Sequence, residues 1–287
     1  MNKITLKNSD LTISMLQPGT KYTRSRFDWT GVVDQISLGG ITFLGKEACG
    51  SYTGSEGLGL STEFGISTPL SYWKTLPGKQ FMKIGVGALK RRSLKPYSFF
   101  DEYDVSPFKT EVKTYDDRVE FLQKNCTVGS YRYDYTKKIR IEDNSLLMEY
   151  HLKNTGESRI KTEEYCHNFF RLGDKDISEH IEVETNYPLK SRKLVGELEV
   201  NGKKISIKTK PEKMIYTYSL LKEKPDDFSW KLKNKRNNIS ISGFESFPVS
   251  KFALWGMKHV ISPETFYSFS LQPGAEQKWS RKYVFEA

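Results

Sequence analysis

Apolar and polar residues alternate along most of this chain, and this period of two restricts its fold more than any other feature. In the segment 146–152, Leu146, Met148 and Tyr150 are apolar, whereas Glu149 and His151 between them are polar. Successive side chains of a strand point to opposite faces, so this pattern predicts a half-buried strand. Helical spacing is not sustained over any window of twelve residues without a Gly, Pro or turn cluster. The sequence therefore predicts a mainly antiparallel all-β protein.

Turn residues separate the predicted strands. Asn201-Gly202, the strongest short hairpin signal, lies between two alternating segments because both central positions of a tight turn need positive φ. Similar turns separate strand-like segments near residues 142–145, 116–117 and 272–274. Without helices to cover it, this sheet must pack on another sheet. We expect a large antiparallel β-sandwich of roughly 15 or more strands, with residues 1–287 forming a single domain, as the length of 287 residues allows.

Two stretches depart from the alternating pattern. Residues 45–65 carry six glycines, and residues 67–110 contain four prolines among aromatic and basic side chains. Both are expected to be long loops. Loops of this length in a compact domain are usually functional.

The composition excludes several classes of protein. The chain holds 5 Trp, 16 Tyr and 17 Phe, too many aromatic residues for a disordered polyelectrolyte. Lys and Arg exceed Asp and Glu by 45 − 35 = 10, and basic clusters at 90–92 and 231–236 can attract phosphate or carboxylate groups. Acidic residues are interspersed and no nucleic-acid module signature is present. We therefore expect solvated basic surfaces and no nucleic-acid partner.

The cellular location of the protein and the state of its cysteine thiols are also predicted from simple sequence patterns. No apolar run approaches the roughly 18 residues of a membrane span, and the first residues lack a signal-peptide core; we expect a cytoplasmic protein without a membrane partner. The three cysteines, Cys49, Cys126 and Cys166, show no C-x-x-C spacing. They are expected to remain buried thiols.

The histidines are few enough to weigh one by one. Four are present in the chain, and His151, His180 and His259 lie in polar settings that predict surface positions. His167 differs because it stands beside Asn168 in a strand-like run of aromatic residues. Burial of this polar pair is costly unless both side chains find partners. His167 is therefore the candidate functional histidine. Motifs of serine hydrolases, zinc peptidases and nucleotide-binding loops are not found.

Several segments, which follow one another along the chain in the family's order, resemble the galactose mutarotase-like (aldose epimerase) superfamily. The segment 147–156 followed by His167-Asn-Phe-Phe-Arg-Leu172 is similar to its strand, Asn-Thr-Gly turn, strand and histidine signature. Trp255-Gly-Met-Lys-His-Val-Ile-Ser-Pro-Glu264, which precedes Phe269-Ser-Leu-Gln-Pro-Gly274, resembles its carboxylate strand and following turn. Residues 31–40 resemble its opening strands. Together these segments identify the chain as a divergent member.

The resemblance implies a β-sandwich with a carbohydrate cleft and a reaction that interconverts the anomers of a free sugar without metal or nucleotide, so no cofactor is expected. Glu264 would take the proton of the anomeric hydroxyl, and His167 would protonate the ring oxygen. Acid–base catalysis of this kind needs one donor and one acceptor with suitable pKa values. We expect the two side chains to line one pocket, about one sugar ring apart.

The chain also departs from the family pattern. Classical members have a further histidine on an earlier strand, and here Glu63, Tyr97 or Lys124 could occupy that place. Arg24, Arg26 and Asn168 are the remaining candidate sugar contacts.

Two alternatives remain open. The chain could be a non-catalytic carbohydrate-binding or polysaccharide-lyase-like relative that lost the acid–base pair, since a shared fold does not transfer function. The substrate could be a neutral hexose or an anionic sugar, because basic residues at 24, 26, 83 and 90–92 lie within or near the loop-rich segments.

Overall fold

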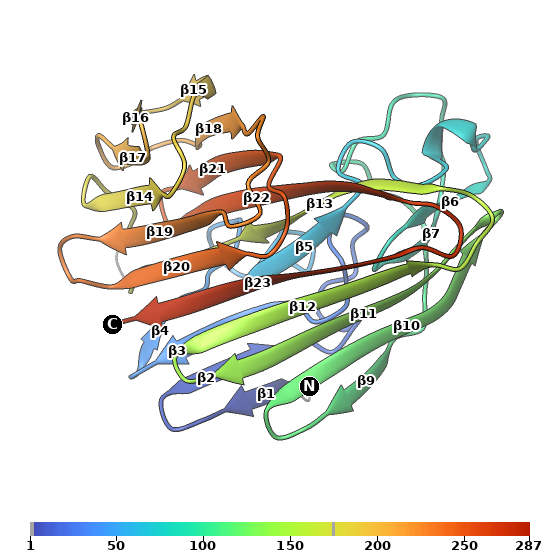
Figure 1. Ribbon diagram of the computed structural model, residues 1–287, viewed down its shortest axis with the longest axis horizontal. Coiled ribbons are helices and arrows are strands. Elements are labelled where there is room, and N and C mark those ends of the chain that lie inside the picture. The colour runs from blue at the N-terminus through green and yellow to red at the C-terminus, as the bar shows by residue number, and fades with distance from the viewer. Residues whose placement is uncertain (1–2, 174–175) are drawn as a thin grey trace.

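Two large antiparallel β-sheets stack against each other in the computed structural model, which describes residues 3–173 and 176–287 (Figure 1). Each sheet contains ten strands. The one helical element of the described residues is a short 3₁₀ turn, η1 (Tyr72–Lys74). The predicted all-β sandwich of roughly 15 or more strands is therefore confirmed. No helix among the described residues has the length and apolar character needed to cross a membrane.

The first sheet carries the strands on which the site described below is built. Its spatial order is β1 (Ile4–Lys7), β2 (Leu11–Met15), β3 (Val33–Leu38), β5 (Leu60–Phe64), β13 (Ile160–Asn168), β22 (Val260–Leu271), β21 (Lys251–Met257), β18 (Ile215–Leu220) and β15 (Ser191–Val195), with β4 (Ile41–Thr42) paired to β3. The central strands β5, β13 and β22 come from distant parts of the sequence.

The second sheet closes the other side of the sandwich. Its spatial order is β16 (Leu198–Asn201), β17 (Lys204–Ile207), β14 (Ile181–Thr185), β19 (Ser229–Asn234), β20 (Ser240–Glu245), β23 (Glu276–Glu286), β12 (Ser145–Asn154), β11 (Tyr131–Glu142), β10 (Arg118–Val128) and β9 (Glu111–Thr114).

The predicted hairpins are present. Ile139 of β11 faces Met148 of β12, and the Asn201-Gly202 turn joins β16 to β17. The turn after β22 behaves differently because its two strands do not pair. β22 belongs to the first sheet and β23 to the second, so this turn carries the chain across the sandwich (Figure 1).

The two stretches expected to be loops contain regular structure. Residues 45–65 end in β5, a central strand whose five residues are all buried. Residues 67–110 form η1 and a small third sheet of β6 (Gln80–Lys83), β7 (Gly87–Lys90) and β8 (Val105–Pro107). The expectation of two long loops was therefore wrong for these parts. The glycines and prolines lie mainly in the turns between short strands, and turns are where such residues are favoured.

Apolar side chains from both sheets fill the space between them in one continuous core. The outer face of the first sheet is covered as well. Tyr22, Phe27 and Leu58, from segments that precede or follow strands, pack there against Phe169 and Val260. A second small cluster, around Tyr72 and Phe81, lies beneath the third sheet. The covering segments thus enclose part of the sheet surface.

At position 59 only glycine fits, for a steric reason. Gly59 has φ +58, and a Cβ at this position would lie 1.9 Å from the carbonyl oxygen of Val33. Only glycine allows the backbone to approach β3 this closely.

The cysteines only partly follow the expectation. Cys126 and Cys166 are buried free thiols, whereas Cys49 is exposed and its Sγ lies 3.2 Å from Nδ1 of His259. Burial of Cys49 was wrongly expected because the glycine-rich segment that carries it lies at the surface.

Candidate functional site

Successive residues of β13 point to opposite faces of the first sheet. Glu164 and Asn168 point inward, where they contact Arg281 and Tyr283 of the second sheet. The intervening residues Tyr165 and His167, and Phe169 just beyond the strand, point outward into the aromatic cluster around Phe27. The outer face of β13 therefore presents a polar imidazole to a covered, water-poor environment.

His167 and Glu264 meet on this outer face. Nδ1 of His167 lies 3.3 Å from Oε1 of Glu264, on the neighbouring strand β22. The same carboxyl oxygen accepts a hydrogen bond from Ser262 Oγ at 3.0 Å. Both side chains are buried, with residue exposures of 3% and 5%. We expected a separation of about one sugar ring; the two groups are instead in direct contact.

Aromatic rings surround the imidazole of His167. The ring of Phe169 stacks on it with a centroid distance of 4.0 Å and an interplanar angle of 9°. Trp255 meets it edge-on at 4.9 Å, and Phe27 does so at 6.1 Å. These contacts leave few ways for the ring to move, so its nitrogen atoms are held in fixed directions.

Burial shifts the pKa values of this pair in opposite directions. Desolvation, reinforced by the nearby positive charge of Arg26, holds the pKa of His167 well below its usual range. Desolvation raises the pKa of Glu264 to about 8, although Ser262 and Arg26 act in the opposite sense. At neutral pH the imidazole is therefore neutral and the carboxyl group mostly carries the proton. Paired titratable groups with strongly shifted pKa values are typical of functional sites.

A network of charged groups adjoins the pair. Arg26 Nε donates to Glu63 Oε2 at 3.1 Å, and its Nη2 donates to the hydroxyl of Tyr165 at 3.0 Å. Nζ of Lys83 donates to the other oxygen of Glu63 at 3.3 Å. Glu63 and Lys83 are almost completely buried. Both cations pair with the one buried carboxylate, and Tyr165 connects the network to the strand that carries His167.

Tyr97 lies beside this network. Its ring is 5.1 Å from Nζ of Lys83, and its buried hydroxyl has no hydrogen-bond partner among the described residues. Glu63 and Tyr97, two of the three candidates for the place of the missing histidine, are therefore close to Lys83 and belong to the same buried region. Lys124, the third, lies on β10 in the second sheet, is exposed and contacts Asp134 at 3.7 Å. The structure does not bring Lys124 into the site, because its strand belongs to the other layer.

A cleft opens on the far side of Arg26. It has a volume of about 520 Å³, and its lining includes Arg24, Arg26, Phe27, Glu47 and Glu102. Arg24 pairs with Glu102 across it, and the guanidinium of Arg26 is 3.6 Å from Glu47. Arg26 and Phe27 line this cleft and also contact the buried site, so they form the partition between the two. We call this space the arginine cleft.

Asn168 has a structural environment. Its amide nitrogen donates to the carbonyl of Pro263, its Oδ1 accepts from the Tyr283 hydroxyl at 3.1 Å, and its backbone N–H donates to Ser262. The side-chain amide of Asn168 and its partner Tyr283 thus lie between the two sheets, whereas Ser262 lies on the outer face beside Glu264. We expected Asn168 to contact the sugar; its side chain points into the sandwich, and this direction is set by strand register.

Sequence reasoning did not find Tyr165 or Ser262, which complete the surroundings of the pair, and it named Lys83 only as one of several basic residues near the loop-rich segments. Tyr165 lies two residues before His167, and period-two alternation places it on the same face. That signal was available. Lys83 had no comparable signal, because it reaches Glu63 from the third sheet.

The other histidines lie apart from this pair. Nε2 of His151 is 3.1 Å from Glu276 at the surface, as expected for a polar strand position. His180 has its ring near the neighbouring Glu179, at 3.6 Å.

Two packed antiparallel sheets, with a covered polar pair on the outer face of one, define a large β-sandwich of the supersandwich type. Comparison with solved structures identifies it more closely. Over 100% of this chain and 98% of the other, it matches a galactose mutarotase related enzyme from Lactobacillus acidophilus, with a TM-score of 0.65 and 10% identity. A galactose mutarotase-like protein from Lactobacillus casei matches over 99% and 100%, with a TM-score of 0.61 and 14% identity.

An aldose epimerase homologue from Caenorhabditis elegans gives a TM-score of 0.57 at 14% identity, over 99% of this chain and 98% of that one. The chain therefore has the galactose mutarotase-like fold, as its sequence segments indicated. No protein-family profile matches it, and no curated protein gives a significant match. At this level of identity the solved structures establish the fold, and the chemistry has to be argued from the residues.

Proposed function

We propose that this chain acts as an aldose 1-epimerase-like enzyme, which interconverts the anomers of a free sugar by acid–base catalysis with His167 and Glu264. The contact of 3.3 Å between these two side chains carries the proposal. It joins the two positions that the sequence resemblance had assigned to the reaction, although they are 97 residues apart. The names of the solved structures with this fold, an aldose epimerase homologue among them, support the same reaction class.

The reaction needs one proton acceptor and one proton donor. The acceptor takes the proton of the anomeric hydroxyl, the bond between the anomeric carbon and the ring oxygen breaks, and the donor protonates that oxygen. The aldehyde end then rotates, and the reverse transfers close the ring on its other face. General acid–base groups typically contribute 10²–10⁴ to such a rate.

The pair holds one proton at neutral pH. Its resting place is Glu264, because burial raises the pKa of this carboxyl to about 8 and lowers that of His167. In this state the carboxyl group is a donor and the neutral imidazole an acceptor. Transfer of the proton to His167 gives the opposite assignment, with Glu264 as base and His167 as acid, at the same net charge. Both arrangements supply the two groups that the reaction needs.

The arginine cleft is the proposed entrance for the sugar. Three cations and three carboxylates, Lys21, Arg24, Arg26, Glu47, Asp101 and Glu102, line it in equal number. This balanced charge, together with hydroxyl groups on the lining residues, suits a neutral, hydroxyl-rich ligand better than an anionic one. Because Arg26 and Phe27 separate the cleft from the pair, both side chains have to shift for the sugar to reach His167.

Equilibration of freshly dissolved α-glucose and α-galactose, followed by polarimetry, tests the proposal. We expect the wild-type protein to accelerate the change in optical rotation. Glu264→Gln and His167→Asn should each slow the catalysed rate by roughly 100-fold or more. His151→Asn is the matched control, because this histidine lies at the surface near Glu276, and it should leave the rate unchanged.

The same experiment separates the alternatives. Sugar binding by the wild-type protein without accelerated equilibration would favour a non-catalytic carbohydrate-binding protein. Equal rates for the Glu264→Gln and His151→Asn variants would show that the acid–base groups lie elsewhere.

A further inference from the structure

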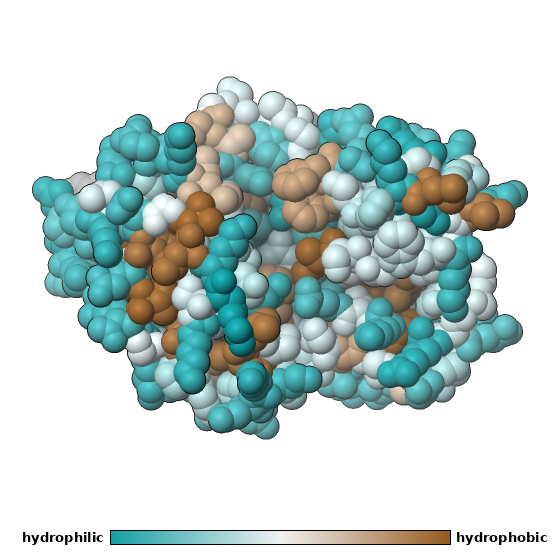
Figure 2. Space-filling model, turned by 90° about the horizontal axis from the view of Figure 1, so that it is seen from above, coloured by the Kyte–Doolittle hydropathy of each residue, from teal (hydrophilic) through white to brown (hydrophobic). Residues whose placement is uncertain are grey.

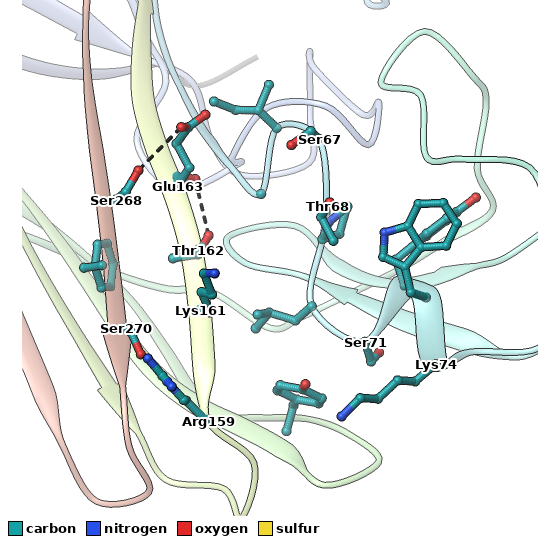
Figure 3. Close-up of a pocket in the computed structure, with 18 residues that line it drawn as sticks. Ser67, Thr68, Ser71, Lys74, Arg159, Lys161, Thr162, Glu163, Ser268 and Ser270 are labelled. Atoms are coloured by element: carbon teal, nitrogen blue, oxygen red, sulfur yellow. Dashed lines mark hydrogen bonds between the residues drawn. The ribbon is translucent and has the colours of Figure 1, made fainter. Parts of the chain in front are cut away.

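A second large cavity lies further along the outer face of β13, away from the acid–base pair. It has a volume of about 790 Å³, within the usual range for small-molecule sites. Its lining includes Thr68, Trp73, Lys74, Arg159, Lys161 and Ser270. One wall is the end of β13 and its neighbour β22, and the other is the segment that leads into η1 (Figure 3). We call this space the strand-end pocket.

The strand-end pocket is distinct from the acid–base pair although both use the same strand face. Lys161 precedes His167 by six residues, which corresponds to roughly 20 Å along a strand. The stacked rings of Tyr165 and Phe266, with centroids 4.7 Å apart, lie between them in the sheet. A single sugar ring cannot occupy both places, so a ligand of the pocket would be separate from a sugar at the acid–base pair.

Positive charge dominates the rim of the strand-end pocket. Lys74 reaches in from η1, while Lys161 of β13 and Arg159, which directly precedes that strand, lie on the opposite side (Figure 3). None of the three forms an ion pair with another residue of the parts described, 3–173 and 176–287. Glu163, the one acidic residue of the lining, accepts a hydrogen bond from Ser268. Three cations against one carboxylate favour an anionic ligand, in contrast to the balanced arginine cleft.

The rest of the lining combines rings and hydroxyl groups. The indole of Trp73 is 55% exposed, which is unusual for so large an apolar side chain. Tyr131 and Phe269 also belong to the lining, although the ring of Phe269 packs against Tyr267 and Trp279 of the core. Hydroxyl groups of Ser67, Thr68 and Ser71 lie on the loop side, whereas those of Ser268 and Ser270 lie on the strand side (Figure 3). Flat apolar surface beside many hydroxyl groups matches a pyranose ring, which has an apolar face and a polar edge.

The surface of the molecule seen in Figure 2 is hollowed and of mixed character. Seen from above, the molecule has a depression between the end that carries β15 and β18 and the end that carries β6 and β7, with hydrophobic and hydrophilic residues side by side around it (Figure 2). Contiguous apolar patches rimmed by polar groups are typical of interaction sites.

From the three cations, the exposed indole and the ring of hydroxyl groups, we propose that the strand-end pocket binds an acidic sugar unit of a glycan, with a carboxylate held by Lys74, Arg159 and Lys161. Charge-assisted hydrogen bonds to the carboxylate orient the ring, and Trp73 offers a surface for its apolar face. The proposal concerns binding alone and does not depend on the acid–base reaction at His167.

Calorimetric titration with trigalacturonate tests this site. We expect saturable binding that weakens as salt is raised, because the cations are exposed. The methyl ester of the same trisaccharide keeps the shape and loses the charge, and it should bind at least about tenfold more weakly, which is the loss of about one charge-assisted hydrogen bond.

Three variants assign the binding to the pocket. Lys161→Gln and Trp73→Ala should each weaken trigalacturonate binding by roughly tenfold. Lys7→Gln, an exposed lysine on β1 that is not part of the pocket lining, is the matched control for the loss of one charge and should bind like the wild type. Glu264→Gln should also leave this binding unchanged, so failure here and failure of the proposed reaction can be told apart.

The same titration, repeated with other anions, tests which class of ligand the pocket prefers. Monomeric galacturonate that binds as tightly as the trisaccharide would place a free acidic sugar, rather than a glycan chain, in the pocket. Sulfate or triglutamate binding as tightly as trigalacturonate would overturn the proposal in favour of a simple anion site or an acidic peptide site. Equal affinity of the trisaccharide and its methyl ester, or equal binding by the Lys161→Gln and Lys7→Gln variants, would also overturn it.

Discussion

Glu164 and Arg281 form a bidentate ion pair in the interior between the two sheets. Nη1 and Nη2 of Arg281 donate to Oε1 and Oε2 of Glu164 at 2.9 and 2.8 Å, and both side chains are almost completely buried. Arg281 also lies 3.6 Å from Glu245 and donates to the carbonyl of Thr265. The arginine thus joins strands β23, β13, β22 and β20 across the sandwich.

Replacement of this arginine should strongly destabilise the fold. Arg281→Met keeps most of the side-chain volume but leaves the buried Glu164 without its partner. Removing one member of a buried ion pair typically costs about 3–5 kcal/mol. We expect a loss of this size in the free energy of unfolding, measured by urea titration at neutral pH.

An exposed pair provides the control. Arg92 and Asp104 are 3.2 Å apart, with side chains 54% and 65% exposed. Arg92→Met should change the free energy of unfolding by less than about 1 kcal/mol, because exposed ion pairs contribute little. If Arg281→Met lowered the free energy of unfolding as little as Arg92→Met does, the interior would tolerate an unpaired Glu164.

The stability of the protein should depend on the ionisation of Glu264. Its pKa in the folded state is about 8, against an ordinary value of 4.5, because it is buried. Between these two values the folded state binds more protons than the unfolded state, so this group lowers stability as pH rises from about 4.5 to about 8. Glu264→Gln removes the effect because its amide does not ionise.

Comparison of the wild-type protein with the Glu264→Gln variant isolates the contribution of Glu264 to stability. We expect Glu264→Gln to gain stability relative to the wild type on going from pH 5 to pH 9, by an amount on the order of a few kcal/mol. Urea unfolding of both proteins at several pH values measures the difference, in which contributions from other groups largely cancel. A difference that does not change with pH would show that Glu264 is not desolvated as its burial indicates.

The sequence allowed the sandwich to be predicted because a period of two is a local signal. The hairpin of β11 and β12 follows from alternation and turn residues within some twenty positions, and the structure has it. The strands that would carry His167 and Glu264 were also found, because their local sequence is distinctive. What each strand lies beside, however, is set by contacts between distant segments. Local patterns do not report such contacts.

The parts of the site that the sequence analysis missed depend on strand facing or on contacts between distant segments. Tyr165 could have been found from the alternation of side chains along the strand, which places it on the same face as His167. Asn168 was assigned to the site without use of this alternation, and it points inward to Tyr283. The approach of Lys83 to Glu63 depends on how a small separate sheet is placed over the first sheet. No spacing in the sequence encodes that placement.

A glycine outside the acid–base pair should control the position of His167. A Cβ on Gly57 would lie 2.5 Å from ring atoms of Phe169, which stacks on the imidazole. Contacts this short force the ring to move. Gly57→Ala should therefore displace the imidazole and lower kcat/KM for anomer exchange by about 10- to 100-fold, since small misplacements of catalytic groups have effects of this size.

A second glycine separates this effect from backbone strain. Gly78 has φ +85, and a Cβ there would meet nothing within 4 Å. Gly78→Ala should cost some stability and leave kcat/KM near the wild-type value. If both variants retain full activity, Phe169 does not position His167 for the reaction.

The pH dependence of the proposed reaction should reveal how many protons the pair carries. The form with one proton contains a donor and an acceptor, and it prevails at neutral pH because burial raises the pKa of Glu264 to about 8 and depresses that of His167. Above about pH 8 the pair loses this proton and with it the donor. We therefore expect kcat/KM, which reports the ligand-free enzyme, to be level near neutral pH and to fall about tenfold per pH unit above about 8. In the His151→Asn control the same profile should appear, because His151 lies at the surface. A rate that instead rises through pH 8 would mean that the ionised Glu264 is the active form and that a group other than this pair donates the proton to the ring oxygen.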